Sequence, residues 1–149
     1  MYLMNMYQEN GIPYLVAEKE METEIITTPF GVTEMLYKNF KADKLPEEHV
    51  WLMCTNTRME VISVMEISHG TVNCSIIQPR EVLIRALLSG ATNFIIAHNH
   101  PSNSLDESRE DLALCQRMKE AGNLIGIPLV DFLIVGNGIY KSFNEEGLL

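Results

Sequence analysis

Two histidines close together at the end of an apolar run are the first residues of this chain whose types and spacing could do chemistry. His98 and His100 close the segment TNFIIAHNH, residues 92–100, whose nearly unbroken apolar character is typical of a strand buried on both faces. Residues i and i+2 of a strand point to the same side, so both imidazoles face one way and Asn99 faces the other. Zinc accepts nitrogen and oxygen ligands at about 2 Å. The pair therefore predicts part of a metal site at a strand end.

A serine and an aspartate follow after a loop of seven residues, 101–107. Ser108 is suited to cap the next helix, and Asp111 stands at the third position of that helix. A carboxylate in the first turn of this helix lies near the strand end that leads into the loop. His98, His100 and Asp111 thus form a candidate three-ligand zinc site with an open fourth position, which is the arrangement of catalytic zinc.

Each part of this pattern also has a purely structural interpretation. The H-x-H pair alone is a weak signal, a histidine before Pro101 suits a turn, and Ser108 with Asp111 is an ordinary capping box. The occurrence of all three together, directly after a buried strand, favours the metal site. The adjacent letters H-N-H do not indicate the nuclease family of that name, whose residues are widely separated in sequence. The deaminase pattern H-x-E with P-C-x-x-C is absent.

Composition restricts the class of protein and its partners. The chain has 149 residues, of which 46% are hydrophobic, and this suits one domain with a packed core. A net charge of −9 makes strong binding to nucleic acid unexpected, because phosphate affinity comes mostly from lysine and arginine. The apolar stretch 123–138 is broken by Pro128 and Asp131 and is too short for a membrane span. No signal peptide is evident. We therefore expect a soluble, cytoplasmic protein with no membrane partner.

The cysteines agree with a reducing compartment. They are three in number, far apart, and contain no C-x-x-C pair, so neither a disulfide framework nor a zinc ribbon is expected. The three are Cys54, Cys74 and Cys115. Cys115 lies four residues after Asp111 on the same helical face, and a buried core position is the preferred interpretation.

The elements that must position the candidate ligands begin with an N-terminal arm, 1–28, before a single domain, 29–149. Within the arm, PYLVAEKEMETEIIT (13–27) is a candidate strand. TTPFGVTEMLYKNF (27–40) predicts a short helix that Thr28 caps, with a proline in its first turn. Oligomeric state is not readable from the sequence, although the apolar arm is a candidate for pairing with another chain.

The middle of the chain reads as a hairpin, a helix and the buried strand. EEHVWLMCTNTRMEVISVMEIS (47–68) alternates apolar residues around the turn TNTR, and HGTVNCSII (69–77) continues as strand. QPREVLIRALLSG (78–90) predicts a helix with a proline in its first turn and Gly90 at its end. The strand that carries the two histidines follows directly.

The last third reads as a helix and two strands. SREDLALCQRMKEAGNLIG (108–126) predicts a second helix, which we expect to end at Gly122. IPLVDFLIVG (127–136) and GIYKSFN (138–144) are late strands joined by the turn signal GNG. This order of elements predicts an α/β fold with a mixed sheet and flanking helices.

A family resemblance rests on these residues. H-x-H, seven residues and S-x-x-D resemble the JAMM signature of the MPN/JAB domain metalloproteases. The closer resemblance is to the RadC-like branch, whose typical blocks are similar to QPREVLIRALLSGATNFIIAHNHPS, SREDLALCQRMKEAGNLIGIPLVDFLIVG and YKSFNEEGLL. It covers about 31–149 and implies an MPN/JAB-like (cytidine-deaminase-like) mixed sheet flanked by helices. Longer relatives carry an N-terminal helical region with helix-hairpin-helix character, and we expect no DNA-binding role that rests on that region.

The resemblance also implies an upstream glutamate as general base. EEHVWLMCTNTRMEV is similar to the family's block and places that glutamate at Glu48, 50 residues before His98 (98 − 48 = 50). Glu47 would face the opposite side of an extended chain, and Glu66 is the other alternative. An exposed carboxylate at the start of a strand is the non-catalytic interpretation of Glu48.

The chemistry implied is amide hydrolysis by a zinc metallopeptidase or isopeptidase with one zinc per chain. The ion would lower the pKa of a bound water toward about 7. Glu48 would take the proton of that water and pass it to the leaving amine, and the Ser108 hydroxyl would stabilise the oxyanion. The substrate expected is a peptide or protein tail. The alternatives are a non-catalytic MPN interaction module and a DNA repair or recombination accessory protein.

Some positions depart from the family pattern. Relatives usually have glycine after HNHPS and proline before the serine block, where this chain has Asn103 and Asp106–Glu107. The loop over the predicted metal site is therefore altered. The usual L-D-H motif of the late strand appears here as Asp131–Phe132. Asp131 is a candidate second-shell acceptor for a zinc-bound imidazole, and a helix cap or a surface strand position are the alternatives. His49 and His69 are expected on strands away from the site.

Overall fold

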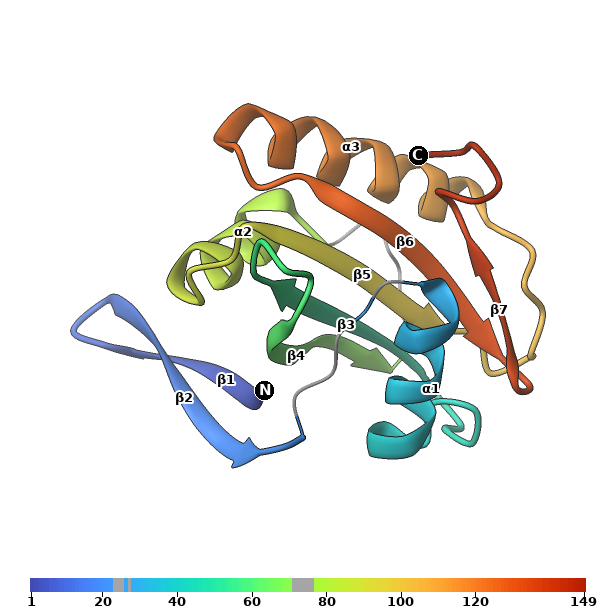
Figure 1. Ribbon diagram of the computed structural model, residues 1–149, viewed down its shortest axis with the longest axis horizontal. Coiled ribbons are helices and arrows are strands. Elements are labelled where there is room, and N and C mark those ends of the chain that lie inside the picture. Colours follow the sequence, from blue (N-terminus) through green and yellow to red (C-terminus); the bar gives the residue numbers. More distant parts are fainter. Residues whose placement is uncertain (23–25, 27, 71–76) are drawn as a thin grey trace.

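The computed structural model describes residues 1–22, 26, 28–70 and 77–149, and Figure 1 shows a single mixed sheet with helices on both faces. The sheet has seven strands in the order β2-β1-β4-β3-β5-β6-β7. The strands are β1 (Tyr2–Glu9), β2 (Ile12–Glu20), β3 (Glu48–Thr55), β4 (Val61–Gly70), β5 (Asn93–Asn99), β6 (Leu129–Gly136) and β7 (Ile139–Ser142). The helices are α1 (Pro29–Phe40), α2 (Pro79–Leu88) and α3 (Arg109–Ile125). The expected α/β class is confirmed.

Strand β5 lies near the middle of the sheet, with a strand on each side. It pairs antiparallel with β3 and parallel with β6. Each β5 residue from Phe94 to Asn99 is buried. This central position explains the nearly unbroken apolar run, because both faces of the strand are covered by helices.

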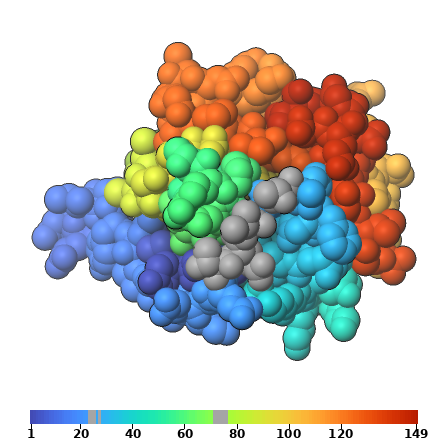
Figure 2. Space-filling view, viewed as in Figure 1, coloured from blue at the N-terminus to red at the C-terminus, as the bar shows by residue number. Residues whose placement is uncertain are grey.

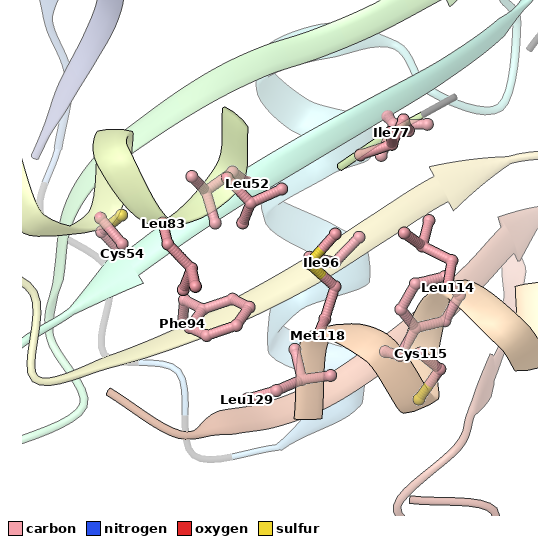
Figure 3. Close-up of a cluster of buried hydrophobic side chains, with 14 of the residues drawn as sticks. Leu52, Cys54, Ile77, Leu83, Phe94, Ile96, Leu114, Cys115, Met118 and Leu129 are labelled. Atoms are coloured by element: carbon pink, nitrogen blue, oxygen red, sulfur yellow. The ribbon is translucent and has the colours of Figure 1, made fainter. Parts of the chain in front are cut away.

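Two hydrophobic clusters lie on the opposite faces of the sheet. Leu52 of β3 and Ile96 of β5 pack with residues of α2 and α3 in the first cluster, part of which Figure 3 shows. Trp51 and Ile95, each one position away, pack with α1 in the second. Consecutive strand residues therefore alternate between the two cores, as the pleat of a strand requires.

The N-terminal residues form a complete hairpin, which the sequence predicted only in part. β1 and β2 pair along their whole length around Asn10 and Gly11, which both have positive φ, 50° and 80°. An Asn-Gly pair of this kind makes the two-residue turn that suits the twist of a hairpin, and this signal was overlooked. Among the described residues, β1 joins the rest of the sheet through Tyr2 and Leu3, which pair with β4. Figure 2 shows the hairpin projecting at one side of the molecule.

The helix starts follow the predicted caps. Thr28 precedes α1 and its side-chain oxygen accepts a hydrogen bond from the backbone N–H of Gly31 at 3.2 Å. Pro79 begins α2, and Gly90 follows its end with a φ of 68°. The hairpin turn between β6 and β7 is confirmed at Asn137, which has a φ of 50°. The predicted continuation of strand over 69–77 holds through Gly70, and the rest of it, apart from Ile77, lies outside the described residues.

The predicted end of the third helix at Gly122 is wrong. α3 continues to Ile125, and Gly126 closes it in the left-handed conformation, with a φ of 77°. A Cβ at Gly122 would lie 2.5 Å from the carbonyl oxygen of Ile127 and 2.9 Å from the ring of Phe94. Gly122 is therefore a contact point between helix and sheet, and not a helix stop. Among the described residues, no helix combines the length and apolar character that crossing a membrane requires.

Candidate metal centre

The two imidazoles of the candidate site stand where β5 leaves the sheet. His98 is fully buried and pairs in register with Val50 of β3 and Ile134 of β6. His100 follows the last residue of the strand. The two rings meet edge to face with centroids 4.8 Å apart, and the ring of Phe132 lies 5.4 Å from that of His98. The histidines therefore face the same side of the sheet, as the i, i+2 spacing predicted.

The carboxylate of Asp111 reaches this point from the first turn of α3. Ser108 is the N-cap of that helix, and its hydroxyl oxygen accepts a hydrogen bond from the Asp111 N–H at 3.0 Å. In return the Ser108 N–H donates to Asp111 Oδ2 at 2.8 Å, and the Ser108 hydroxyl donates to the same oxygen at 2.7 Å. This capping box holds the buried carboxylate in place against the histidines.

Two distances place the Asp111 carboxylate beside both imidazoles. Nε2 of His98 lies 3.4 Å from Asp111 Oδ1, and Nε2 of His100 lies 3.7 Å from Asp111 Oδ2. Glu48 lies within reach of the same place, because Glu48, His98 and His100 each offer a ligand atom within 4.8 Å of the others. The structure thus brings together the four residues to which the sequence pattern assigned the metal ligands and the general base.

Hydrogen bonds on the far edges of the imidazoles set their tautomers. Nδ1 of His98 lies 3.1 Å from Oε1 of Glu48, and Nδ1 of His100 lies 2.8 Å from the carbonyl oxygen of Ser104. The carbonyl oxygen and an ionised carboxylate only accept, so these contacts assign the hydrogen to Nδ1, and in the neutral imidazole Nε2 then presents a lone pair. A hydrogen-bonded Nδ1–H is the usual way in which a metal-binding imidazole is oriented.

The buried Nε2 atom of His98 is the observation that tests whether a metal fits. It has no hydrogen-bond partner within the described part of the chain. The lone pairs of two neutral imidazoles and a negative carboxylate repel one another where they converge, and a buried polar atom without a partner, as Nε2 of His98 is among the described residues, is costly. A divalent cation would relieve both penalties. The residues present therefore fit zinc, which takes nitrogen and oxygen ligands in this way.

Glu48 is the first residue of β3, and its side chain is 21% exposed. It lies two residues before Val50, the register partner of His98, so the pairing of β3 with β5 brings it to the imidazole. Glu47 is exposed. Glu66 pairs with Trp51 and lies 3.1 Å from His49 Nδ1, on the opposite face of the sheet from the metal centre. Of the three glutamates considered, only Glu48 contacts a candidate ligand.

His49 and His69 lie apart from the metal centre, as expected. They are register partners on β3 and β4, and their rings stack with centroids 5.6 Å apart. Both bond to Glu66, at 3.1 Å and 2.7 Å. Cys115 is buried in the first hydrophobic cluster, together with Leu52 and Ile96, as predicted. Burial raises the pKa of its thiol to about 11.

Asp131 does not act on a metal-binding histidine in this structure. It stands near the start of β6 opposite Ile95, several residues from the strand end that holds the imidazoles. Its carboxylate accepts hydrogen bonds from the Ser142 hydroxyl at 2.6 Å, the Asn144 N–H at 3.1 Å and the Phe132 N–H at 2.8 Å. The second-shell assignment is therefore corrected: Asp131 anchors the segment after β7, and its burial raises the pKa of its carboxyl group.

The loop between the ligands packs against β6 and β7. Asn103 has a φ of 58°, in the left-handed region that favours glycine and tolerates asparagine. A Cβ on Gly136 would lie 3.2 Å from the Cα of Asn103, which shows how closely the loop approaches β6. Glu107 forms an ion pair with Lys141 of β7. The loop is thus held at two points beside the metal centre.

Asn99 is the residue of the site that the sequence interpretation missed. Its side chain turns away from the imidazoles, as predicted, yet it is buried and accepts a hydrogen bond from the His49 N–H at 2.7 Å. It also donates to the carbonyl oxygen of Glu47 at 2.9 Å. A polar residue within an otherwise apolar strand was the signal, since a buried amide needs partners.

Comparison with known proteins places these features in a family. The family model of the RadC-like JAB domain matches residues 26–148. A UPF0758 protein of Clostridium acetobutylicum is 38% identical over 133 residues, which cover 89% of this chain and 57% of the relative. A UPF0758 protein of Clostridium tetani is 37% identical over 131 residues, covering 88% and 57%. One of Clostridium kluyveri is 41% identical over 105 residues, covering 70% and 46%.

The chain spans about half the length of these curated relatives. The matched region contains all of the candidate ligands, Glu48 and the helices and strands that position them, because it runs from before α1 to the penultimate residue. The chain belongs to the family of RadC-like JAB domains.

Proposed function

We propose that this protein is a zinc-dependent amide hydrolase of the JAMM type, a metallopeptidase or isopeptidase with one zinc per chain. The observation that carries the proposal is the unpartnered, buried Nε2 of His98, which converges with His100 Nε2 and the Asp111 carboxylate. These three residues would hold the metal. When bound, zinc supplies a Lewis acid that polarises an amide carbonyl and activates a water molecule as nucleophile.

Glu48 would move the proton during hydrolysis. Its carboxylate stands at the edge of the centre with 21% of the side chain exposed, so it can reach both the centre and an incoming substrate. It would accept a proton from the attacking water and deliver it to the leaving amine nitrogen. In the structure it lies 3.1 Å from His98 Nδ1, on the edge of the imidazole away from Nε2, so this proton transfer requires the carboxylate to rotate toward the metal.

Ser108 would stabilise negative charge on the carbonyl oxygen of the substrate. In the structure its hydroxyl hydrogen is directed at Asp111 Oδ2, at 2.7 Å. Donation to a substrate oxyanion therefore requires the hydroxyl to rotate away from Asp111, while its oxygen continues to accept from the Asp111 N–H. The same residue would serve as helix cap and as oxyanion donor.

The substrate class that fits is an extended peptide or protein tail. His98 and Asp111 are buried, whereas His100 and Glu48 are partly exposed, so the centre opens toward solvent on the side of these two residues. Phosphate-rich partners are disfavoured, because the chain carries a net charge of −9. A DNA accessory role would require strong binding to plain duplex DNA at moderate salt, and we expect none.

Metal analysis combined with a peptide-library cleavage assay tests this function. We expect about one zinc per chain, its loss in a His98→Ala, His100→Ala double variant, and cleavage by the wild type. Glu48→Gln should keep the zinc and lose cleavage, because the amide cannot accept the proton. Glu47→Gln is the matched control, since this neighbouring glutamate is exposed, and it should cleave like the wild type.

Two results would overturn the proposal. Zinc that persists after both histidines are replaced would rule out this metal site. Zinc bound in the wild type without cleavage of any library member would favour the non-catalytic interaction module instead.

A further inference from the structure

The asparagine between the two histidines occupies a special place relative to Glu48. The last register pair between β3 and β5 joins Val50 to His98, and β5 ends one residue later, at Asn99. The backbone before Val50 therefore loses its neighbouring strand on this side. The side chain of Asn99 takes over, accepting from the His49 N–H at 2.7 Å and donating to the Glu47 carbonyl oxygen at 2.9 Å.

These two backbone groups belong to the two peptide units that flank Glu48. The Glu47 carbonyl lies in the peptide unit before the Glu48 Cα, and the His49 N–H lies in the unit after it. Each peptide unit is planar, so the orientations of the two planes define φ and ψ of Glu48. A single buried amide group that bonds to both planes fixes both angles. The direction of the Cα–Cβ bond of Glu48 is fixed with them.

We infer that Asn99 is a positioning residue that aims the Glu48 carboxylate at the metal centre. Asn99 touches neither imidazole through these bonds, and it acts from the other face of the sheet through the backbone of Glu48. The catalytic part of this inference rests on the proposed function, while the structural part does not. On its other edge β3 pairs with β4 at this point, Glu48 with Gly70, so the amide of Asn99 supplies the hold on the side of β5.

The ¹⁵N NMR signals of the His98 imidazole report whether the Glu48 carboxylate contacts this ring, and the measurement needs neither metal nor substrate. The chain has only four histidines, so histidine labelled with ¹⁵N gives a simple two-dimensional spectrum that substitutions of the other three can assign. The reference state for a lost carboxylate contact is Glu48→Ala, which has no side-chain acceptor. In metal-free Asn99→Ala we expect the His98 Nδ1–H signal to move from its wild-type position toward that of Glu48→Ala.

Asn93→Ala is the matched control. Asn93 begins the same strand at its other end and bonds to Thr92 and the sulfur of Met59, away from the metal centre. Its variant should leave the His98 signals at their wild-type positions. Wild-type positions in Asn99→Ala as well would overturn the inference.

A second variant covers the case in which Asn99→Ala does not fold, which circular dichroism shows. Asn99→Asp keeps the acceptor for the His49 N–H and loses the donor to the Glu47 carbonyl, so only one peptide plane is released. We expect a smaller movement of the His98 signal in the same direction. An unchanged signal in a folded Asn99→Asp protein would count against the inference.

Activity supplies an independent readout if the proposed function holds. Asn99→Ala should keep about one zinc per chain and an unchanged KM, while kcat falls by about 10- to 100-fold, the loss expected when a catalytic group is misplaced by about 1 Å. Loss of zinc would show that Asn99 acts on the metal ligands instead. A wild type that binds zinc but does not cleave refutes the hydrolase, and the imidazole spectra still decide the role of Asn99.

Discussion

Nε2 of His98 lies 3.4 Å from Oδ1 of Asp111, and both atoms are buried acceptors. The two residues come from different elements, the end of β5 and the first turn of α3, and the loop between them bends back to bring them together. Two desolvated acceptors this close repel each other, and a cation bound between them would relieve that repulsion. This relationship leads to the first prediction.

Zinc should raise the melting temperature of the purified, metal-stripped protein. A ligand that binds only the folded state stabilises it by about 2.7 kcal/mol at 100 times its dissociation constant. Differential scanning calorimetry with and without zinc measures this shift. The shift should vanish in His98→Ala and persist in His69→Ala, whose imidazole lies on β4 away from the centre. Equal shifts in both variants would show that zinc binds elsewhere.

Ser108→Ala should lower both stability and zinc affinity. The alanine removes the acceptor of the Asp111 N–H and the hydroxyl that bonds to Asp111 Oδ2. Loss of such an N-cap lowers the free energy of unfolding by about 1 kcal/mol. Urea denaturation of the metal-free protein gives this value, and a zinc titration gives the affinity. Ser108→Thr keeps a capping hydroxyl and should retain most of both, so an equal loss in the two variants would contradict the capping role.

Asp131→Asn should flatten part of the pH dependence of stability and leave zinc content unchanged. Burial raises the pKa of Asp131 above its ordinary 3.8, so its carboxyl group favours folding while protonated. That contribution is fully present below pH 3.8 and is lost as the pH rises through the raised pKa of the folded state. The neutral amide has no such loss, so the stability of the variant relative to the wild type should increase across this window.

Urea denaturation at a series of pH values from about 3 to 7, a series that spans the ordinary range of carboxyl pKa values, measures this difference in stability. Asp131→Ala is the comparison. It leaves the Ser142 hydroxyl and the Asn144 N–H without their acceptor and should destabilise the protein at every pH. A drop in zinc content in Asp131→Asn would restore the second-shell assignment.

Two helix glycines should respond in opposite ways to alanine. Gly122→Ala forces a methyl group against the Ile127 carbonyl oxygen, 2.5 Å away, and the Phe94 ring, and it should lower the free energy of unfolding by roughly 1–3 kcal/mol. Gly31→Ala, in α1, meets only Thr28 Oγ1 at an ordinary 3.6 Å and should stabilise the protein by about 0.5–1 kcal/mol. Urea denaturation of the two variants side by side checks the contrast, and equal effects would refute the close helix–sheet contact.

Local signals in the sequence were sufficient where the structure depends on neighbours in the chain. Thr28 and Ser108 cap their helices as predicted, because a cap involves only the next three residues. The H-x-H spacing placed both imidazoles on one face, since alternation along a strand is local. The Asn10 turn was equally local, and only its Asn-Gly signal was overlooked.

Other features depended on packing between distant segments. The prediction that the helix ends at Gly122 is wrong because a glycine in the sequence does not show whether it ends a helix or allows close packing against Phe94. Asp131 was given a role near the histidines, yet the register of β6 against β5 sets it opposite Ile95. The residues next to Gly122 and Asp131 in the sequence do not determine either contact.

The sequence by itself determined the candidate ligands, their common face and the caps that hold Asp111, because these follow from spacings within one strand end and one helix turn. Only the tertiary structure decided that Glu48, 50 residues before His98, contacts its imidazole. It also decided that the side chain of Asn99 forms hydrogen bonds with the backbone on both sides of Glu48. The physical reason is the register of β3 against β5, which the fit of side chains in both cores sets across the sheet.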